Sequence, residues 1–204
     1  MLVFHSQKLV VFSVPRTGST SLHKALRPHA DFELSNPPGD KHMNVQRFET
    51  WAKEKHRRYL RFRRAAVIRD PLARIASWYA YRRRDAVRGT EKSTEAMSFN
   101  DYVEDVLSDA PSPPAKIGNQ HDFLTLAGGD LGVQELFCIE RADVMVAHFR
   151  GLFGHVDLPH RNASPPVELS LDPALEDRLR QERRAEFALF QKVAATGHLI
   201  VSNA

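Results

Sequence analysis

The sequence predicts an α/β fold, with a central parallel sheet covered by helices on both faces in a three-layer, P-loop-like arrangement. Three short apolar runs rich in β-branched or aromatic residues, 9–14, 65–68 and 135–139, have the composition of strands buried on both faces. Each is followed by apolar residues at helical spacing. Strands that alternate with helices favour parallel pairing, because each crossover helix returns the chain to the same edge of the sheet.

The helices follow these strands in order. Residues 19–26 carry Leu22 and Leu26 at helical spacing. Pro71 is suited to the first turn of the second helix, which we expect to extend to about residue 84. A third helix follows residue 139, and residues 173–195 predict one long amphipathic helix.

Length and composition are consistent with a single domain over residues 1–204. The chain is 42% hydrophobic and 26% charged, enough for one packed core. No stretch approaches the about 20 apolar residues of a membrane span. Cys138 is the only cysteine, so no internal disulfide can form, and we expect it to pack inside its strand.

The net charge of +4 is concentrated in a basic run at residues 53–64. Such a run favours an anionic partner, but a solvated helix face explains it equally well when it is taken alone. Both interpretations stay open here.

The first candidate site is the turn between the strand at 9–14 and the helix at 19–26. Backbone N–H groups at such a junction, together with the helix N-terminus, favour a bound phosphate. Gly18 allows close approach of the anion, Arg16 supplies positive charge, and the hydroxyl groups at 19–21 can donate hydrogen bonds and cap the helix. The predicted loop comprises Pro15, Arg16, Thr17, Gly18, Ser19, Thr20 and Ser21.

The loop is not a nucleoside-triphosphate P-loop. That motif needs Gly, four residues and then Gly-Lys-Ser/Thr, whereas Ser19 follows Gly18 and Ser13 stands five residues before it. The three spaced glycines of a dinucleotide-binding turn are also missing.

A second candidate anion site lies at residues 66–79, about fifty residues later, where another strand enters a helix. Arg69 at the strand end can reach a phosphate with two parallel hydrogen bonds, and Ser77 can turn its hydroxyl group to the same anion. Two junctions of this kind predict a ligand with two phosphate groups.

These motifs resemble those of the sulfotransferases that use 3′-phosphoadenosine-5′-phosphosulfate (PAPS). Residues 14–21 are similar to their 5′-phosphosulfate loop, Pro-Lys-x-Gly-Thr/Ser-Thr-Ser/Trp, with Arg16 in place of the usual Lys. Residues 69–79 match their 3′-phosphate signature, Arg-Asn/Asp-Pro-x-x-Arg-x-x-Ser-x-Tyr. The resemblance is closest to bacterial sulfotransferase-like proteins and Golgi carbohydrate sulfotransferases, including the heparan sulfate uronyl 2-O-sulfotransferases.

The resemblance implies in-line transfer of a sulfuryl group from PAPS to an acceptor hydroxyl group, with 3′-phosphoadenosine-5′-phosphate (PAP) as product. It favours a carbohydrate as the acceptor. Arg16 would stabilise the leaving phosphate. His42 is the expected general base, because it lies between the two phosphate sites at a position from which related enzymes supply their base. Lys41 is expected to orient the sulfuryl oxygens or bind an acidic acceptor, and Arg161 to close over the 3′-phosphate.

Further residues carry weaker hypotheses. Glu140 is an alternative base, more simply explained by pairing with Arg141 or another cation. His121 and Asp122 could line the acceptor cleft but are more simply explained as structural. Phe12, Trp51 and Trp78 could stack on adenine but have the spacing of core residues. No metal-ligand spacing is present, so no metal site is predicted.

Two other classes of function compete. A P-loop-type small-molecule kinase or nucleotide hydrolase shares the phosphate cradle, and a binding module would use residues 53–64 to hold nucleic acid or an acidic polysaccharide. The sulfotransferase interpretation instead predicts a small-molecule or glycan acceptor, anionic acceptors included, with no nucleic-acid or membrane partner. It predicts a cytoplasmic bacterial enzyme, or a Golgi one if an anchor has been removed. It predicts no particular oligomeric state.

Overall fold

The computed structural model describes residues 1–158 and 169–201. Its strands form one six-stranded sheet in the order β3-β1-β2-β4-β5-β6. The strand bounds are β1 Leu2–Phe4, β2 Leu9–Phe12, β3 Phe32–Glu33, β4 Arg63–Ile68, β5 Glu135–Cys138 and β6 His198–Ile200. The three predicted strands correspond to β2, β4 and β5, which lie side by side and parallel.

Three strands beyond those predicted extend the sheet antiparallel. β1 forms a hairpin with β2 and also pairs with β3, while β6 pairs with β5 at the other edge. These strands have only two or three residues, too few to show a period of two. The sheet is therefore mixed, with a parallel centre.

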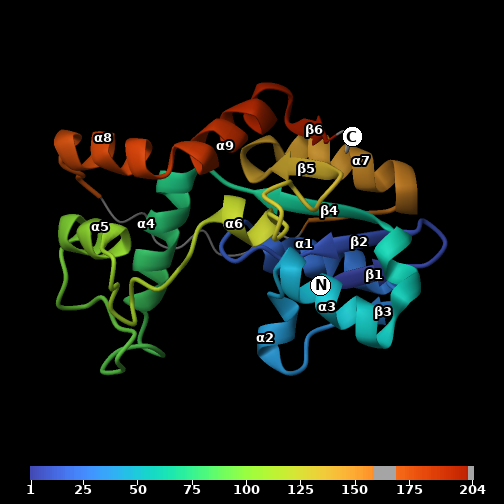
Figure 1. Ribbon diagram of the computed structural model, residues 1–204, viewed down its shortest axis with the longest axis horizontal. Helices are drawn as coiled ribbons and strands as arrows, with labels where there is room; N and C mark the ends of the chain where they lie inside the picture. Colours follow the sequence, from blue (N-terminus) through green and yellow to red (C-terminus); the bar gives the residue numbers. More distant parts are fainter. Residues whose placement is uncertain (159–168, 202–204) are drawn as a thin grey trace.

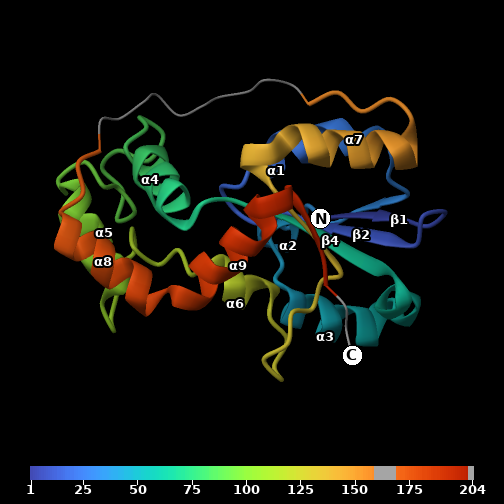
Figure 2. The ribbon, with the colours of Figure 1, turned by 90° about the horizontal axis from the view of Figure 1, so that it is seen from above.

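Helices cover both faces of the sheet (Figures 1 and 2). The helices are α1 Ser19–Leu26, α2 Pro38–Lys41, α3 Val45–Lys55, α4 Pro71–Arg82, α5 Phe99–Leu107, α6 Gln120–Leu124, α7 Ala142–Phe153, α8 Pro173–Glu182 and α9 Arg184–Thr196. Short 3₁₀ turns occur at Arg27–His29, Arg57–Arg61 and Ile139–Arg141.

Alternate residues of the central strands divide the sheet core into two clusters. Val11 and Val67 face Leu22 of α1 and Phe149 of α7. On the other face, Phe12, Ala66 and Cys138 belong to a cluster completed by side chains of α3, α6 and α9. Cys138 is fully buried, as its strand position predicts.

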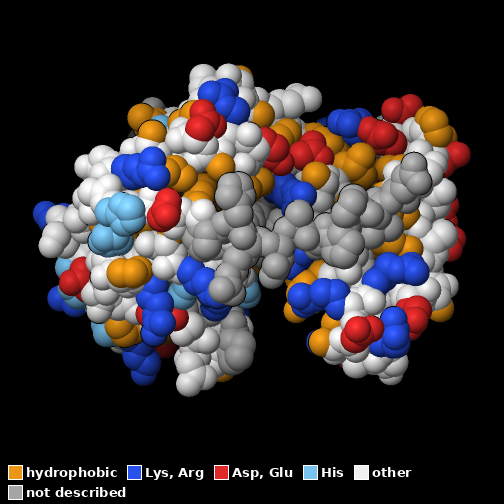
Figure 3. Space-filling view, turned by 180° about the vertical axis from the view of Figure 1, so that it is seen from behind, with side chains coloured by type: hydrophobic (Ala, Val, Ile, Leu, Met, Phe, Trp, Pro, Cys, Tyr) orange, Lys and Arg blue, Asp and Glu red, His pale blue; other side chains and the backbone are white. Residues whose placement is uncertain are grey.

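A third hydrophobic cluster lies in a helical half beside the sheet half (Figure 1). It joins α4, α5 and α8 through buried residues such as Ile75, Tyr102 and Leu179. From behind, a notch separates the two halves, with Lys and Arg side chains on both sides of it (Figure 3). None of the helices in residues 1–158 and 169–201 is long and apolar enough to span a membrane.

The prediction of one long helix at 173–195 is wrong. The helix breaks at Arg183, whose φ of −105° and ψ of 26° end α8 and begin α9. The Arg183 guanidinium donates to the carbonyl oxygens of Val106 and Gly118 and lies 3.5 Å from the Glu186 carboxylate. Contacts with distant backbone therefore set the break, in a stretch that contains neither glycine nor proline.

Candidate active site

The loop between β2 and α1 has two residues with left-handed backbone. Arg16 has φ of 70° and Gly18 has φ of 74°. A Cβ atom at Gly18 would lie 2.8 Å from Ile139 Cδ1, so both the conformation and the available space favour glycine there. Alternating backbone conformations of this type turn successive N–H groups to one side, which is the geometry of an anion-binding nest.

The N–H groups of this loop are open. Within the described part of the chain, those of residues 17–20 have no hydrogen-bond acceptor, while Ser21 and Leu22 donate to the Gly18 carbonyl oxygen. The expectation that the hydroxyl groups at 19–21 cap α1 is wrong, because Gly18 occupies the N-cap and no side chain caps the helix. The helix end consequently keeps its donors for a ligand.

The second junction, between β4 and α4, has a different construction. Asp70 is the N-cap of α4, and its carboxylate accepts from the N–H of Ala73 over 2.8 Å. Asp70 also donates its own N–H to Glu140 Oε1. Because a carboxylate already fills this helix end, an anion at the second junction would have to be bound by side chains, those of Arg69 and Ser77.

The two junctions meet directly. Arg16 donates from Nε and Nη2 to the Ser77 hydroxyl oxygen, over 3.1 and 2.8 Å. Ser77 is buried on α4, two turns beyond Pro71. Since the hydroxyl oxygen accepts both bonds, its hydrogen stays available for donation to a third group. The two predicted anion sites thus face one another and share Ser77 as a boundary.

Aromatic and cationic side chains continue this site along α4. The guanidinium carbon of Arg16 lies 4.6 Å from the Tyr81 ring centroid, and that of Arg84 lies 3.7 Å from the same centroid. The Arg16 pKa is lowered, first by burial and then by the positive charges of Arg84 and Arg69. Several guanidinium groups within Coulomb range repel one another, and a bound anion would relieve that repulsion.

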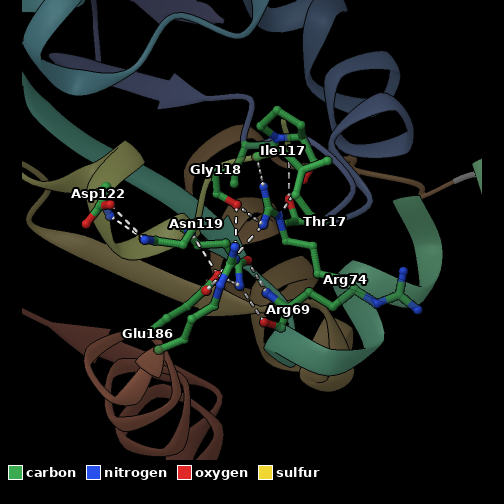
Figure 4. A network of polar contacts seen from close by, with 12 residues as sticks. Thr17, Arg69, Arg74, Ile117, Gly118, Asn119, Asp122 and Glu186 are labelled. Atoms are coloured by element: carbon green, nitrogen blue, oxygen red, sulfur yellow. Dashed lines mark hydrogen bonds and ion pairs between the residues drawn. The ribbon is translucent and has the colours of Figure 1, made fainter. Parts of the chain in front are cut away.

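A buried polar network supports both junctions (Figure 4). Arg74, only 2% exposed, donates to the carbonyl oxygens of Pro15, Ile117 and Gly118 over 3.1 Å each. Its guanidinium also lies 3.8 Å from the buried Glu186 carboxylate of α9. Burial lowers the Arg74 pKa to about 10, which still leaves the side chain charged near neutral pH.

Gln120 connects Arg69 to this network. Its side-chain oxygen accepts from the Arg69 N–H, and its side-chain nitrogen donates to the Arg69 carbonyl oxygen and to Glu186. The backbone of Arg69 is thereby fixed, while its side chain points away from the network (Figure 4). No carboxylate of the described residues lies within ion-pair distance of that guanidinium, so it is available to an anion.

His42 lies beside the start of the phosphate loop. Its Nδ1 is 2.7 Å from the carbonyl oxygen of Ser13, the residue after β2. A carbonyl oxygen can only accept, so Nδ1 carries the hydrogen and Nε2 keeps its lone pair. Burial is the main cause that lowers the His42 pKa, and the nearby Lys41 charge adds to it. The neighbouring Lys41 is half-buried at the end of α2, and burial also lowers its pKa.

The weaker candidates have structural contacts. The prediction that Glu140 pairs with Arg141 or another cation is wrong for the described residues, because Arg141 pairs with Asp143 and Glu140 accepts from the Asp70 N–H instead. His121 lies 3.5 Å from Asp122 in α6. Arg161, which was predicted to close over the 3′-phosphate, lies outside the described residues.

Of the three aromatic candidates, only one lies at the loops. Phe12 packs on Phe48 in the core, and Trp51 packs among Phe32, His56 and Tyr59. Trp78 is half-buried, with its ring centroid 6.0 Å from the Arg16 guanidinium carbon.

Sequence reasoning assigned no role to Tyr81, Arg74 or Gln120. The signal for Tyr81 was available, since it follows Ser77 by four residues and therefore shares its helix face. Arg74 stands inside the second motif, but only the fold shows that it is buried. No local pattern marks Gln120.

The fold is that of an α/β protein with a candidate anion site at each of two strand-to-helix loops, and these loops lack the nucleoside-triphosphate motif. Residues 1–125 match the model of the sulfotransferase family. The matched range includes both loops, His42 and α4. The chain belongs to the sulfotransferase family and is a transferase that moves a sulfuryl group. No curated protein and no solved structure gives a significant match.

Proposed function

We propose that this sulfotransferase takes its sulfuryl group from PAPS and transfers it to an acceptor hydroxyl group, with His42 as general base. The contact of Arg16 with Ser77 carries the proposal, because it brings the two candidate anion sites next to one another, as a doubly phosphorylated adenosine would require. The open N–H groups of residues 17–20 suit the 5′-phosphosulfate, and Arg69 with Ser77 suits the 3′-phosphate.

In the proposed step, the acceptor oxygen attacks sulfur in line with the bond to the donor phosphate. The new S–O bond forms as the old one breaks, the acceptor proton passes to His42 Nε2, and PAP leaves with the additional negative charge. Arg16 and the loop N–H groups stabilise that charge as it develops. They need little reorientation during the reaction, because the fold already orients them.

The acceptor that we favour is a carbohydrate hydroxyl group, including that of an anionic glycan. Lys41 is half-buried next to His42, where its ammonium group would attract an acidic acceptor or the sulfuryl oxygens. A cytoplasmic bacterial enzyme without nucleic-acid or membrane partners remains part of this proposal.

Calorimetry tests the donor class. PAP should bind to the full chain without a metal ion, whereas ATP with Mg²⁺ should bind much more weakly. Arg69→Ala should weaken PAP binding by about 10- to 100-fold, the effect of losing hydrogen bonds to a charged group. The matched control is Arg57→Ala, which removes an equal charge from an exposed position in the basic run.

Binding of ATP with Mg²⁺ in preference to PAP would instead favour the kinase or hydrolase alternative. Transfer of labelled sulfate from PAPS to a panel of glycans and metabolites would then identify the acceptor class. If PAP binds but no glycan is sulfated, the carbohydrate assignment is wrong while the donor assignment stands.

A further inference from the structure

Three potential metal ligands converge on one side of the sheet. Glu135 begins β5, His148 lies on α7 and His198 begins β6. His148 Nε2 lies 3.0 Å from Glu135 Oε2, and His198 Nε2 lies 3.5 Å from the same oxygen. The three ligand atoms all lie within 4.8 Å of one another.

The ligand atoms are held in place by their surroundings. The His198 ring stacks on Phe137 with a centroid separation of 4.3 Å, and the His148 ring packs on the same side chain at 5.0 Å. Arg63 donates to Glu135 Oε1 and leaves Oε2 facing the two imidazole rings. One carboxylate oxygen is thus bound by Arg63 and the other is left for a cation, which suits monodentate coordination. Arg63 would then orient the Glu135 ligand.

The packing of the His198 ring leaves one of its nitrogen atoms without a hydrogen-bond partner in the described part of the chain. His198 Nε2 is buried and makes no hydrogen bond of good geometry with any described residue. A buried nitrogen without a hydrogen-bond partner costs free energy, and coordination of a cation by that nitrogen would remove the cost. The side chains of His148 and His198 are 24% and 22% exposed, so the cluster lies close to the protein surface.

We propose that Glu135 Oε2, His148 Nε2 and His198 Nε2 form a binding site for a divalent transition-metal cation, with Zn²⁺ the best fit. Two imidazole nitrogens and one carboxylate oxygen form a ligand set that zinc accepts, and solvent completes the tetrahedron. Tetrahedral ligands at zinc bond lengths lie about 3.3 Å apart, close to the two distances from Glu135.

The site is distinct from the proposed sulfuryl-transfer site. Glu135 lies at the amino end of β5, whereas the phosphate loops follow the carboxyl ends of β2 and β4. A cation there would connect the edge strand β6 to β5 and α7. The sequence predicted no metal site because the ligands are separated by 13 and 50 residues, spacings that belong to no zinc motif.

Titration of the chelator-treated full chain with ZnCl₂ tests the proposal. We expect one Zn²⁺ per chain and a rise in Tm, with His148→Ala and Glu135→Gln each weakening binding by at least about tenfold. The control His155→Ala, a change at an exposed histidine, should bind Zn²⁺ like the unchanged chain. Co²⁺ should give the intense visible absorption of a four-coordinate site.

PAP binding and circular dichroism check that each variant is folded. Glu135→Gln retains the side-chain shape, so it reports on the ligand even if an alanine variant unfolds. Absence of stoichiometric Zn²⁺ binding to the unchanged chain, or equal binding by His148→Ala and Glu135→Gln, would overturn the proposal.

Discussion

At the scale of single residues, two side chains, those of His42 and Arg16, have contacts on which the candidate site depends. His42 donates from Nδ1 to Ser13, and Arg16 donates twice to Ser77. The first bond leaves Nε2 of the histidine as a proton acceptor, and the second places a guanidinium group between the two anion sites. Each role depends on a partner outside the residue's own motif.

His42→Ala should abolish transfer and leave PAP affinity unchanged. Loss of a general base costs about 100- to 10,000-fold in rate. Because burial lowers the His42 pKa, kcat/KM should rise with pH through a midpoint below the usual value of about 6.5 and be level by neutral pH. Pre-steady-state rates and PAP calorimetry measure both effects, with His155→Ala as control. Full activity of His42→Ala would remove this residue from the base role.

Ser77→Ala should weaken PAP binding by roughly tenfold, since one hydrogen bond to a charged group is lost and Arg16 loses its anchor. Arg16→Ala should weaken binding as well, and the double variant should lose less than the sum, because the two residues act through one contact. A double-mutant cycle by calorimetry gives the coupling energy. Strict additivity would show that the contact does not contribute to the bound state.

At the scale of elements, Arg74 connects α4 to segments that approach from elsewhere in the chain. Its three carbonyl partners belong to the phosphate loop and to residues 117–118, and its ionic partner belongs to α9. The local sequence predicts α4 well, because Pro71, the Asp70 cap and the apolar stripe are nearest-neighbour signals. It says nothing of these distant partners.

Arg74→Met should reduce the free energy of unfolding by about 3–5 kcal/mol, because the buried Glu186 carboxylate loses one of its two cationic partners and three carbonyl oxygens lose their donor. Urea denaturation measures the change. Arg178→Met is the control, because it removes only an exposed pair with Glu182 and should cost no more than about 1 kcal/mol. Equal losses in the two variants would contradict the structural role given to Arg74.

At the scale of the whole molecule, the basic run at 53–64 contains residues that form ion pairs within the fold and residues that face solvent. Arg63 and Arg64 pair with Glu135 and Glu49, so they serve the fold. Lys55, Arg57 and Arg61 are exposed and form no ion pair with described residues. The net positive charge available for an anionic acceptor is therefore smaller than the sequence count suggests.

His23 predicts how stability depends on pH. His23 is buried on α1, and burial is the main cause that lowers its pKa to about 4. The positive charges of the amino-terminal group, Lys41 and Arg27 lower the pKa further, and the negative charge of Glu33 raises it. The folded state then binds fewer protons than the unfolded state between pH 6.5 and 4. The free energy of unfolding should fall across this window as pH decreases, by at most about 3 kcal/mol for this group.

The measurement is urea denaturation at several pH values, with the difference between the unchanged chain and His23→Gln as readout. The glutamine variant cannot titrate, so its stability should fall less steeply between pH 6.5 and 4. Parallel curves for the two proteins would show that His23 is not the group responsible.

The sequence alone determined the elements whose signals are local. The three parallel strands, the helices after them and both phosphate motifs follow from composition and spacing over a few residues, so they could be predicted. Tertiary structure decided which side chains meet. Arg16 and Ser77 are 61 residues apart, and Gln120 and Glu186 are 66 apart. Such pairs form only when sheet register and helix packing bring distant segments together, and no short-range pattern encodes that geometry.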